Sequence, residues 1–195
     1  CLINEFAKHG ARVLDLCCGN GGDVSKLQSA GCSNYIGVDI SEGACERAQK
    51  RLHSSGMQGD VIVCDAFGND MMSIVDGLSS FDLVNCQFAL HYSFDDESHA
   101  RNALRVVSTA LRDGGMLIGT VADGDELDSR RSLLGKQFGD RYFKVKFALQ
   151  SATEFGDAYA FTFNGAVDNL TEYATRRHTF VRIAAEVDLQ VQLWE

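Results

Sequence analysis

The residues best suited to hold a ligand lie in Val13–Asp23, whose sequence VLDLCCGNGGD joins an apolar run to a glycine-dense loop. Gly19, Gly21 and Gly22 allow a sharp turn and let the backbone lie against a ligand, because a Cβ would block the approach. A second carboxylate, Asp39, ends the next apolar run about 20 residues later, the separation at which a nucleotide-binding βα unit brings an acid to a ribose. The two features predict a site for an adenosine-containing ligand.

The loop departs from the dinucleotide-binding pattern G-x-G-x-x-G. Its tight C-G-x-G-G turn follows Asp15, and this arrangement suits a ligand with a charged amino-acid tail better than one with a pyrophosphate. S-adenosylmethionine is therefore the predicted cofactor. Asp39 could simply cap the following helix, but its distance from the loop favours the ribose role. Asp65 stays open between a turn residue and a contact to adenine. Gln87 ends an apolar strand, where burying an unpartnered amide is costly, so a ligand-facing role is favoured.

Residues 86–94, CQFALHYSF, combine aromatic rings with polar groups just after a predicted strand. A histidine among aromatic residues usually packs in a core, but His91 and Tyr92 follow the strand end, where the chain should face a cleft. Rings with polar tips can stack on a base and hydrogen-bond its edge. Tyr159, Phe161 and Phe163 alternate along one strand and share a face, although the core of a hairpin is an equally good interpretation for at least one of them.

The elements that carry these residues alternate between strand and helix. Strands are predicted over 12–17, 35–40, 61–64, 81–88 and 116–121, and helices over 23–29, 41–52 and 98–111. This order predicts a parallel sheet with right-handed crossovers, whose ligands collect at the carboxyl ends of the strands. Further on, a helix is expected over 126–134, a hairpin added to the sheet over 142–149 and 158–163, a helix over about 170–187 and a last strand over 190–194.

Composition limits the function classes. The net charge of −9 argues against a surface that coats nucleic acid, but not against a nucleotide end held in a pocket. The seven cysteines lack zinc-ligand spacing, which favours reduced thiols in an intracellular protein and predicts no metal site. No apolar run approaches the roughly 20 residues of a membrane span. The 195 residues are expected to form a single domain, a fragment of a longer chain that continues at both ends.

These motifs, taken in order, resemble those of the eukaryotic mRNA cap guanine-N7 methyltransferases over nearly the whole chain. Leu2, Ile3 and Phe6 resemble the L-I-x-x-F helix of the family, and VLDLCCGNGGD is similar to V-L-D-L-G-C-G-K-G-G-D. QFALHYSF resembles Q-F-x-x-H-Y-x-F, the most specific element. DGGMLIGTVADGDEL resembles P-G-G-x-x-I-G-T-x-x-D-x-x-x-L. YAFTF and VDNLTEY are similar to Y-x-F and V-x-x-x-P-E-Y.

The resemblance implies an α/β class I S-adenosylmethionine-dependent methyltransferase, Rossmann-like, with a mostly parallel seven-stranded sheet and an inserted hairpin and helix for the cap. The implied reaction is methylation of guanine N7 in the mRNA 5′ cap, GpppN, by in-line transfer without a general base. The capped mRNA end is the implied partner, together with other capping-enzyme subunits or domains, and the nucleus is the implied location.

The resemblance also implies roles for individual residues. The implied cofactor set is Asp15, Cys17, Gly19, Asp39, Asp65 and Gln87. The implied cap set is Phe88 (through its main chain), His91, Tyr92 and Glu172, with Tyr159 and Phe161 lining the pocket. A carboxylate at Glu172 can accept from the N1–H and N2 amino groups of guanine together, which adenine cannot supply. The alternative role for Glu172 is an acid at a helix start.

Three positions depart from the family pattern: Cys17 replaces a glycine, Asn20 a lysine and Thr171 a proline. Two other functions therefore stay open. One is a class I methyltransferase for small molecules, against which residues 87–94 and Glu172 argue. The other is a domain that binds the cap or scaffolds a capping subunit without catalysis, which Cys17 and Asn20 keep open.

Overall fold

The computed structural model describes residues 2–78, 80–149 and 151–194. These residues form two compact units. The first comprises the residues up to Leu90 together with Asn102–Thr120, and the second comprises His91–Arg101 and the residues from Val121 onward. Each unit is built around one β-sheet. Both lie within the span for which a single domain is predicted.

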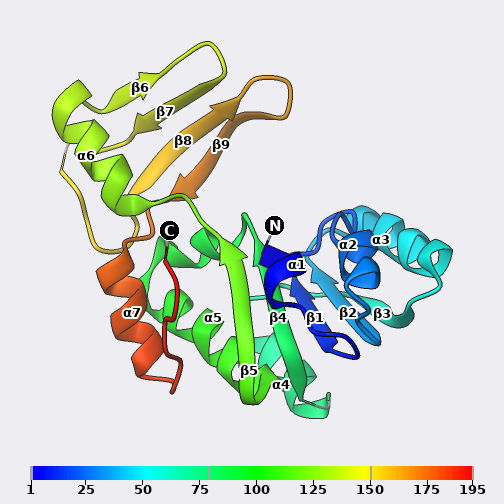
Figure 1. Ribbon diagram of the computed structural model, residues 1–195. Coiled ribbons are helices and arrows are strands. Elements are labelled where there is room, and N and C mark those ends of the chain that lie inside the picture. The colour runs from blue at the N-terminus through cyan, green and yellow to red at the C-terminus, as the bar shows by residue number, and fades with distance from the viewer. Residues whose placement is uncertain (1, 79, 150, 195) are drawn as a thin grey trace. The chain divides into compact units, whose positions relative to one another are not determined.

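The apolar runs of the first unit form a five-stranded parallel sheet in the order β3-β2-β1-β4-β5 (Figure 1). The strands are β1 (Arg12–Leu16), β2 (Asn34–Asp39), β3 (Gln58–Val63), β4 (Phe81–Gln87) and β5 (Leu111–Thr120). β1 lies at the centre and is buried from Val13 to Leu16, as its mostly apolar sequence predicts. The prediction of an α/β fold with parallel strands is confirmed. The carboxyl ends of β1, β2 and β4 carry the glycine loop, Asp39 and Gln87.

Helices cover this sheet. They are α1 (Leu2–Phe6), α2 (Val24–Ser29), α3 (Glu42–Ser55), α4 (Asn69–Gly77) and α5 (Glu97–Ala110), the last of which enters the first unit at Asn102. The predicted start of α3 is confirmed, because the Ser41 side chain accepts from the Ala44 amide. Gly56, with φ of 76°, ends the helix in the left-handed conformation. Apolar side chains from α1, α2, α3 and the sheet share one buried core that includes Leu27, Tyr35 and Leu52.

The second unit contains an antiparallel sheet in the order β6-β7-β8-β9 (Figure 1). Its strands are β6 (Gln137–Gly139), β7 (Phe143–Phe147), β8 (Ala158–Phe163) and β9 (Val167–Tyr173). Its helices are α6 (Gly124–Leu134), α7 (Arg177–Ala185), a 3₁₀ turn at Leu90–Asp95 that begins in the first unit, and the first turn of α5. Phe138, Val145, Phe147 and Tyr159 form the core of this sheet.

Three details of the predicted fold are wrong. The parallel sheet has five strands rather than seven. The hairpin of β7 and β8 is not added to that sheet, because it pairs with β6 and β9 in a sheet of its own. The residues from 190 to 194 form no strand; instead Trp194 packs against Phe180 of α7, with ring centroids 5.3 Å apart.

The helix predicted from about residue 170 begins later than expected. Residues 167–173 form β9, which pairs with β8 so that Tyr159 lies opposite Glu172. The helix α7 starts at Arg177. The TEY sequence carries no helical start signal strong enough to oppose this pairing, and tertiary contacts override weak local propensity. Glu172 is therefore a strand residue, and its alternative role at a helix start is excluded.

Candidate functional site

The glycine loop is held to β2 by Asp39. One carboxylate oxygen of Asp39 accepts from the Gly19 amide at 2.8 Å, and the other accepts from the Ser41 amide at 2.9 Å. The loop also lies close to α3, since a Cβ added at Gly21 would stand 3.0 Å from the Ala48 Cα. This tight approach and the left-handed backbone of Gly21, with φ of 71°, both favour glycine. The predicted pairing of the loop with an acid about 20 residues later is thus a direct contact.

Cys17, which stands where the family pattern has a glycine, adopts a left-handed backbone with φ of 55°. This conformation costs an L-residue other than glycine roughly 1–2 kcal/mol. The turn therefore keeps the shape that a glycine would favour, and the side chain of Cys17 is half-buried beside the loop.

Asp15 lies beneath the loop and is only 2% exposed. One of its oxygens accepts from the Tyr35 hydroxyl at 2.8 Å and the other from the Asn85 amide at 2.7 Å. Burial removes water from the carboxylate and raises its pKa to about 7. Asp15 therefore titrates near neutral pH.

This raised pKa makes protein stability depend on pH. In the unfolded chain the Asp15 carboxyl has a pKa near 3.8, so the folded state holds the proton more tightly. Its contribution is fully present below about pH 4 and is lost as the pH rises towards 7. Relative to Asp15→Asn, the wild-type free energy of unfolding should fall by up to about 1.4 kcal/mol per pH unit across that window. Urea unfolding at pH 4.5, 5.5, 6.5 and 7.5 measures the difference. A difference that stays constant with pH would show that Asp15 titrates normally.

Gln87 and Phe88 line a cavity of about 170 Å³ at the end of β4, together with Leu2, Ile3, Asp23 and Lys26. Lys26 forms an ion pair with Asp23 at 2.5 Å, so the cavity presents both signs of charge. Phe88 has a left-handed backbone with φ of 55°, and its ring is 72% exposed. The Phe88 amide donates to Thr120, and the Phe88 side chain belongs to the first unit rather than to the cap set of the second.

Asp65 is exposed and accepts from the Phe67 amide at 3.0 Å, which is the geometry of a turn residue. Asp65 thus has the turn role that the sequence left open. The turn uses one carboxylate oxygen, and the other has no hydrogen bond among the described residues.

Three residues of the predicted cap set meet in the second unit. His91 Nε2 lies 3.8 Å from a Glu172 carboxylate oxygen, although 81 positions separate the two residues in the sequence. The Tyr159 hydroxyl donates to the other Glu172 oxygen at 2.7 Å. The structure thus brings residues from these distant segments together within the second unit. Tyr159 also packs in the hydrophobic core, so its structural interpretation holds as well.

His91 is the unusual member of this group. It is 2% exposed, and neither ring nitrogen has a hydrogen-bond partner among the described residues. Burial lowers its pKa to about 4, so the ring is neutral at pH 7 and its contact with Glu172 is not an ion pair. Burial also raises the pKa of Glu172. A buried imidazole without partners costs folding free energy unless a ligand supplies the missing hydrogen bonds.

The remaining aromatic residues differ in exposure. The Tyr92 ring lies 4.4 Å from the His91 ring, and Tyr92 is half-buried. Phe161 is half-buried between Val145 and Leu170 on the neighbouring strands. Phe163, on the same strand, is 47% exposed. Phe161 thus remains able to line a pocket beside Tyr159.

Three residues that hold candidate cofactor-site side chains of the first unit in place were not predicted from the sequence: Tyr35, Asn85 and Thr120. Each lies in a predicted strand, and each hydrogen-bonds a candidate site residue from a neighbouring position in the sheet. A polar side chain within an apolar strand is the only sequence signal that could have identified them. Their partners could not be read from the sequence.

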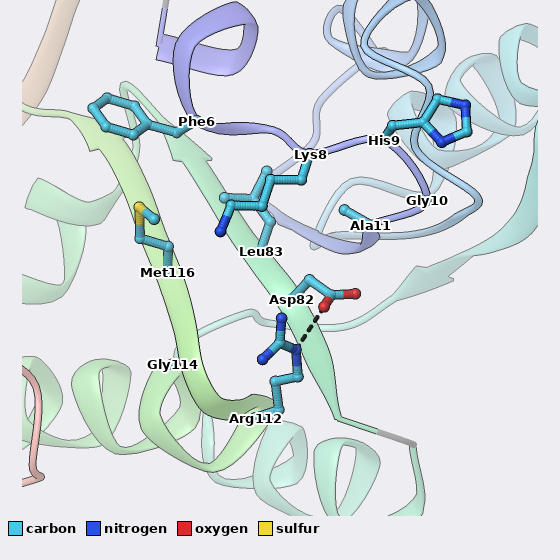
Figure 2. A pocket seen from close by; sticks show the side chains of 10 residues that line it. All are labelled: Phe6, Lys8, His9, Gly10, Ala11, Asp82, Leu83, Arg112, Gly114 and Met116. Atoms are coloured by element: carbon cyan, nitrogen blue, oxygen red, sulfur yellow. Dashed lines mark hydrogen bonds and ion pairs between the residues drawn. The ribbon is translucent and has the colours of Figure 1, made fainter.

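A second cavity, of about 180 Å³, lies at the opposite edge of the parallel sheet, by the amino-terminal ends of β4 and β5. Figure 2 shows Lys8 and the ion pair of Arg112 with Asp82 beside it. Ligands of parallel sheets bind at the carboxyl ends of strands, so this cavity is not the candidate cofactor site.

The described residues contain no cluster of three acidic, histidine or cysteine side chains that could hold a metal. None of the helices among them is long and apolar enough to cross a membrane.

Two solved structures with a similar fold are methyltransferases. An S-adenosylmethionine-dependent methyltransferase from Clostridium acetobutylicum matches with a TM-score of 0.60 and 16% identity, covering 100% of this chain and 83% of that one. The sugar N-methyltransferase KedS8 from Streptoalloteichus matches with a TM-score of 0.58 and 17% identity, covering 93% and 76%. These likenesses confirm the class I methyltransferase fold.

Proteins related to the chain by sequence indicate a narrower family than the structural neighbours do. The mRNA cap guanine-N(7) methyltransferase of Candida glabrata is 34% identical over 98% of this chain and 51% of its own length. The corresponding proteins of Arabidopsis thaliana and Saccharomyces cerevisiae are 33% and 32% identical over 97% of this chain, and 56% and 48% of their own lengths. The chain thus spans about half the length of these curated relatives. The model of the mRNA (guanine-N(7))-methyltransferase domain matches residues 1–194, and the chain belongs to that family.

Proposed function

We propose that the chain methylates N7 of the cap guanine with S-adenosylmethionine. The observation that carries the proposal is the buried, unpartnered His91 ring beside the Glu172 carboxylate. The guanine edge presents an O6 acceptor next to the N1–H and N2 donors. An imidazole N–H and a carboxylate side by side are complementary to that pattern. They are not complementary to the edge of adenine. Tyr92, Tyr159 and Phe161 supply rings around this pair, and the main chain of Phe88 is assigned to the guanine by family resemblance.

We assign the cofactor to the first unit. Asp39, which already holds the Gly19 amide, has the position expected of a ribose ligand. The cavity beside Gln87 offers the Asp23 carboxylate and the Lys26 ammonium group to the charged amino-acid tail. We assign the Asp65 carboxylate to the adenine ring of the cofactor. Asp15 is buried and Cys17 is a half-buried residue of the turn itself, so we assign both to the support of the loop rather than to direct contact with the cofactor.

The proposed chemistry needs no general base. Guanine N7 attacks the methyl carbon with its lone pair, the carbon–sulfur bond breaks with its electrons going to sulfur, and S-adenosylhomocysteine leaves as a neutral thioether. No proton is lost from N7. Rate enhancement then comes from holding N7, the methyl carbon and sulfur in line, an orientation effect that can supply up to roughly 7–11 kcal/mol. The low pKa of His91 supports a role for it as a neutral hydrogen-bonding group.

The test is transfer of labelled methyl from S-adenosylmethionine to unmethylated GpppG, with ApppA and free GTP as parallel acceptors. We expect label only in products that contain guanine, with GpppG preferred, and 7-methylguanine after digestion. Cofactor binding in calorimetry without transfer to any acceptor would favour a non-catalytic cap-binding or scaffold domain. Transfer to small metabolites but not to GpppG would favour a small-molecule methyltransferase.

Replacing Asp39 by alanine should weaken S-adenosylmethionine binding at least tenfold. The substitution removes a charged acceptor for the ribose hydroxyls and the contact that fixes the loop, and hydrogen bonds to charged groups contribute about 1.5–3 kcal/mol each. Calorimetric titration measures the change. Asp60→Ala, at an exposed acid in β3, is the matched control and should bind like wild type. Equal affinity of the Asp39 variant and the control for S-adenosylmethionine would show that Asp39 does not bind the cofactor.

A nuclear location and association with other capping subunits also belong to this proposal, because they follow from the family rather than from the geometry. Fluorescence imaging of the tagged protein and co-purification with a guanylyltransferase would test them. Exclusion from the nucleus would contradict the location without affecting the chemistry.

A further inference from the structure

We propose that Asn85 is a positioning residue of the cofactor site, because its side chain sets the orientation of two acids and one amide at once. It stands in β4 beside Asp15 of β1 and is completely buried. This inference rests on the proposed function, since two of the side chains that it orients, Asp23 and Gln87, line the cavity assigned to S-adenosylmethionine. Neither the motifs of the sequence nor the family resemblance gives Asn85 a role.

Both hydrogens of the Asn85 amide are used on carboxylates. The Nδ2 atom donates to Asp15 at 2.7 Å and to Asp23 at 3.1 Å. Asp15 lies under the glycine loop, and Asp23 lines the cavity at the end of β4. One amide therefore joins the support of the loop to the wall of the cavity and separates two acids that would otherwise repel each other.

The oxygen of the same amide fixes Gln87. Gln87 Nε2 donates to Asn85 Oδ1 at 2.8 Å, and Gln87 Oε1 accepts from the Thr120 hydroxyl at 3.0 Å. Thr120 Oγ1 in turn accepts from the Phe88 amide at 3.0 Å. Every donor thus points the same way, from Phe88 through Thr120, Gln87 and Asn85 to the two carboxylates.

This direction leaves Gln87 no alternative orientation. A flipped Gln87 amide would set its oxygen against the Asn85 oxygen, and two acceptors cannot bond, so the buried Asn85 oxygen would lose its donor. Chains of hydrogen bonds with one direction also polarise each other and strengthen cooperatively. Asn85 consequently determines which atoms Gln87 presents to the cavity that it lines.

The chain of hydrogen bonds ends at two carboxyl groups, those of Asp15 and Asp23. The charged and titratable side chains around Asn85 come from β1, the glycine loop, β2, the start of α2 and β4 itself: Asp15, Cys17, Cys18, Tyr35, Asp23, Lys26 and Cys86. β5 contributes the uncharged Ile118 and Thr120. An acid placed at position 85 would join two carboxylates in a buried site, so one proton would be shared among the three with a raised pKa.

The test uses Asn85→Asp, which has nearly the same shape but lacks the amide donors. At pH 8 its affinity for S-adenosylmethionine should fall at least tenfold, because three carboxylates repel one another and displace Asp15 and Asp23. At pH 6 the shared proton restores a donor, and the affinity should return to within about threefold of wild type. A side chain that only fills space would give the same loss at both pH values, so such a result would overturn the proposal.

A control variant and a double-mutant cycle complete the experiment. Asn102→Asp removes an amide that donates to the Phe67 carbonyl elsewhere in the same unit, and it should bind the cofactor like wild type at both pH values. Asn85→Leu combined with Gln87→Leu should lose less affinity than the sum of the single losses, because each change already disrupts the shared orientation. Urea midpoints of all variants verify folding. Additive losses, or unchanged affinity of Asn85→Asp at pH 8, would remove the positioning role. Failure of wild type to bind S-adenosylmethionine would overturn the proposed function as well.

Discussion

Replacing Glu172 by alanine is expected to lower kcat/KM for GpppG about a hundredfold or more while leaving S-adenosylmethionine affinity within twofold. The carboxylate is the only group proposed to accept from both N1–H and N2 of guanine. Hydrogen bonds to a charged group contribute about 1.5–3 kcal/mol each, so losing two of them corresponds to at least a hundredfold. Steady-state methyl transfer and calorimetry measure the two quantities. Glu126→Ala, which removes an exposed carboxylate of α6 paired with Arg130, is the matched control and should retain wild-type kinetics.

A modified substrate sharpens this prediction. A cap with hypoxanthine in place of guanine lacks the N2 amino group, so wild type should use it at least tenfold less efficiently. In Glu172→Ala the discrimination should largely disappear, because the partner of the amino group is already absent. Undiminished discrimination by the variant would mean that Glu172 does not touch the guanine edge and that another acceptor reads N2.

Replacing Asp157 by alanine is expected to lower the free energy of unfolding by about 3–5 kcal/mol. Asp157 is 1% exposed and accepts from Arg131 at 2.8 and 2.9 Å, and also from Arg176. Asp128 is the second acid of this cluster, so the wild-type charges balance. The substitution leaves an excess positive charge in a buried site that joins α6, β8 and the start of α7. Urea unfolding measures the loss, and a thermal midpoint lower by roughly 10 °C should accompany it.

Charge balance supplies the control for this prediction. Adding Arg131→Met to Asp157→Ala restores equal numbers of opposite charges and should recover part of the lost stability, since apolar side chains can replace a buried ion pair. Arg130→Ala, on the exposed face of the same helix, should cost no more than about 1 kcal/mol. Equal losses from Arg130→Ala and Asp157→Ala would show that the cluster contributes no more than a surface ion pair.

Local patterns in the sequence determined the scaffold of the first unit. Mostly apolar runs between helix signals predicted β1, β2 and β4, and Ser41 with Gly56 marks the limits of α3. The glycine loop and Asp39 were readable because both lie at the ends of consecutive elements of one βα unit, whose geometry fixes their separation. The same reasoning failed from residue 167 onward, where β9 forms only because β8 offers a partner strand.

The sequence by itself therefore determined the kind of fold, the glycine loop with its acid, and the segments that carry the cap residues. Only the tertiary structure decided that Asn85 links Asp15 to Gln87, that His91 lies unpartnered beside Glu172, and that Asp157 is neutralised by two arginines. The physical reason is separation along the chain. Capping, turns and periodicity act between residues a few positions apart. The contacts of Asn85 with Asp15, of His91 with Glu172 and of Asp157 with the two arginines join positions 19 to 81 residues apart, which come together only when sheets and helices pack.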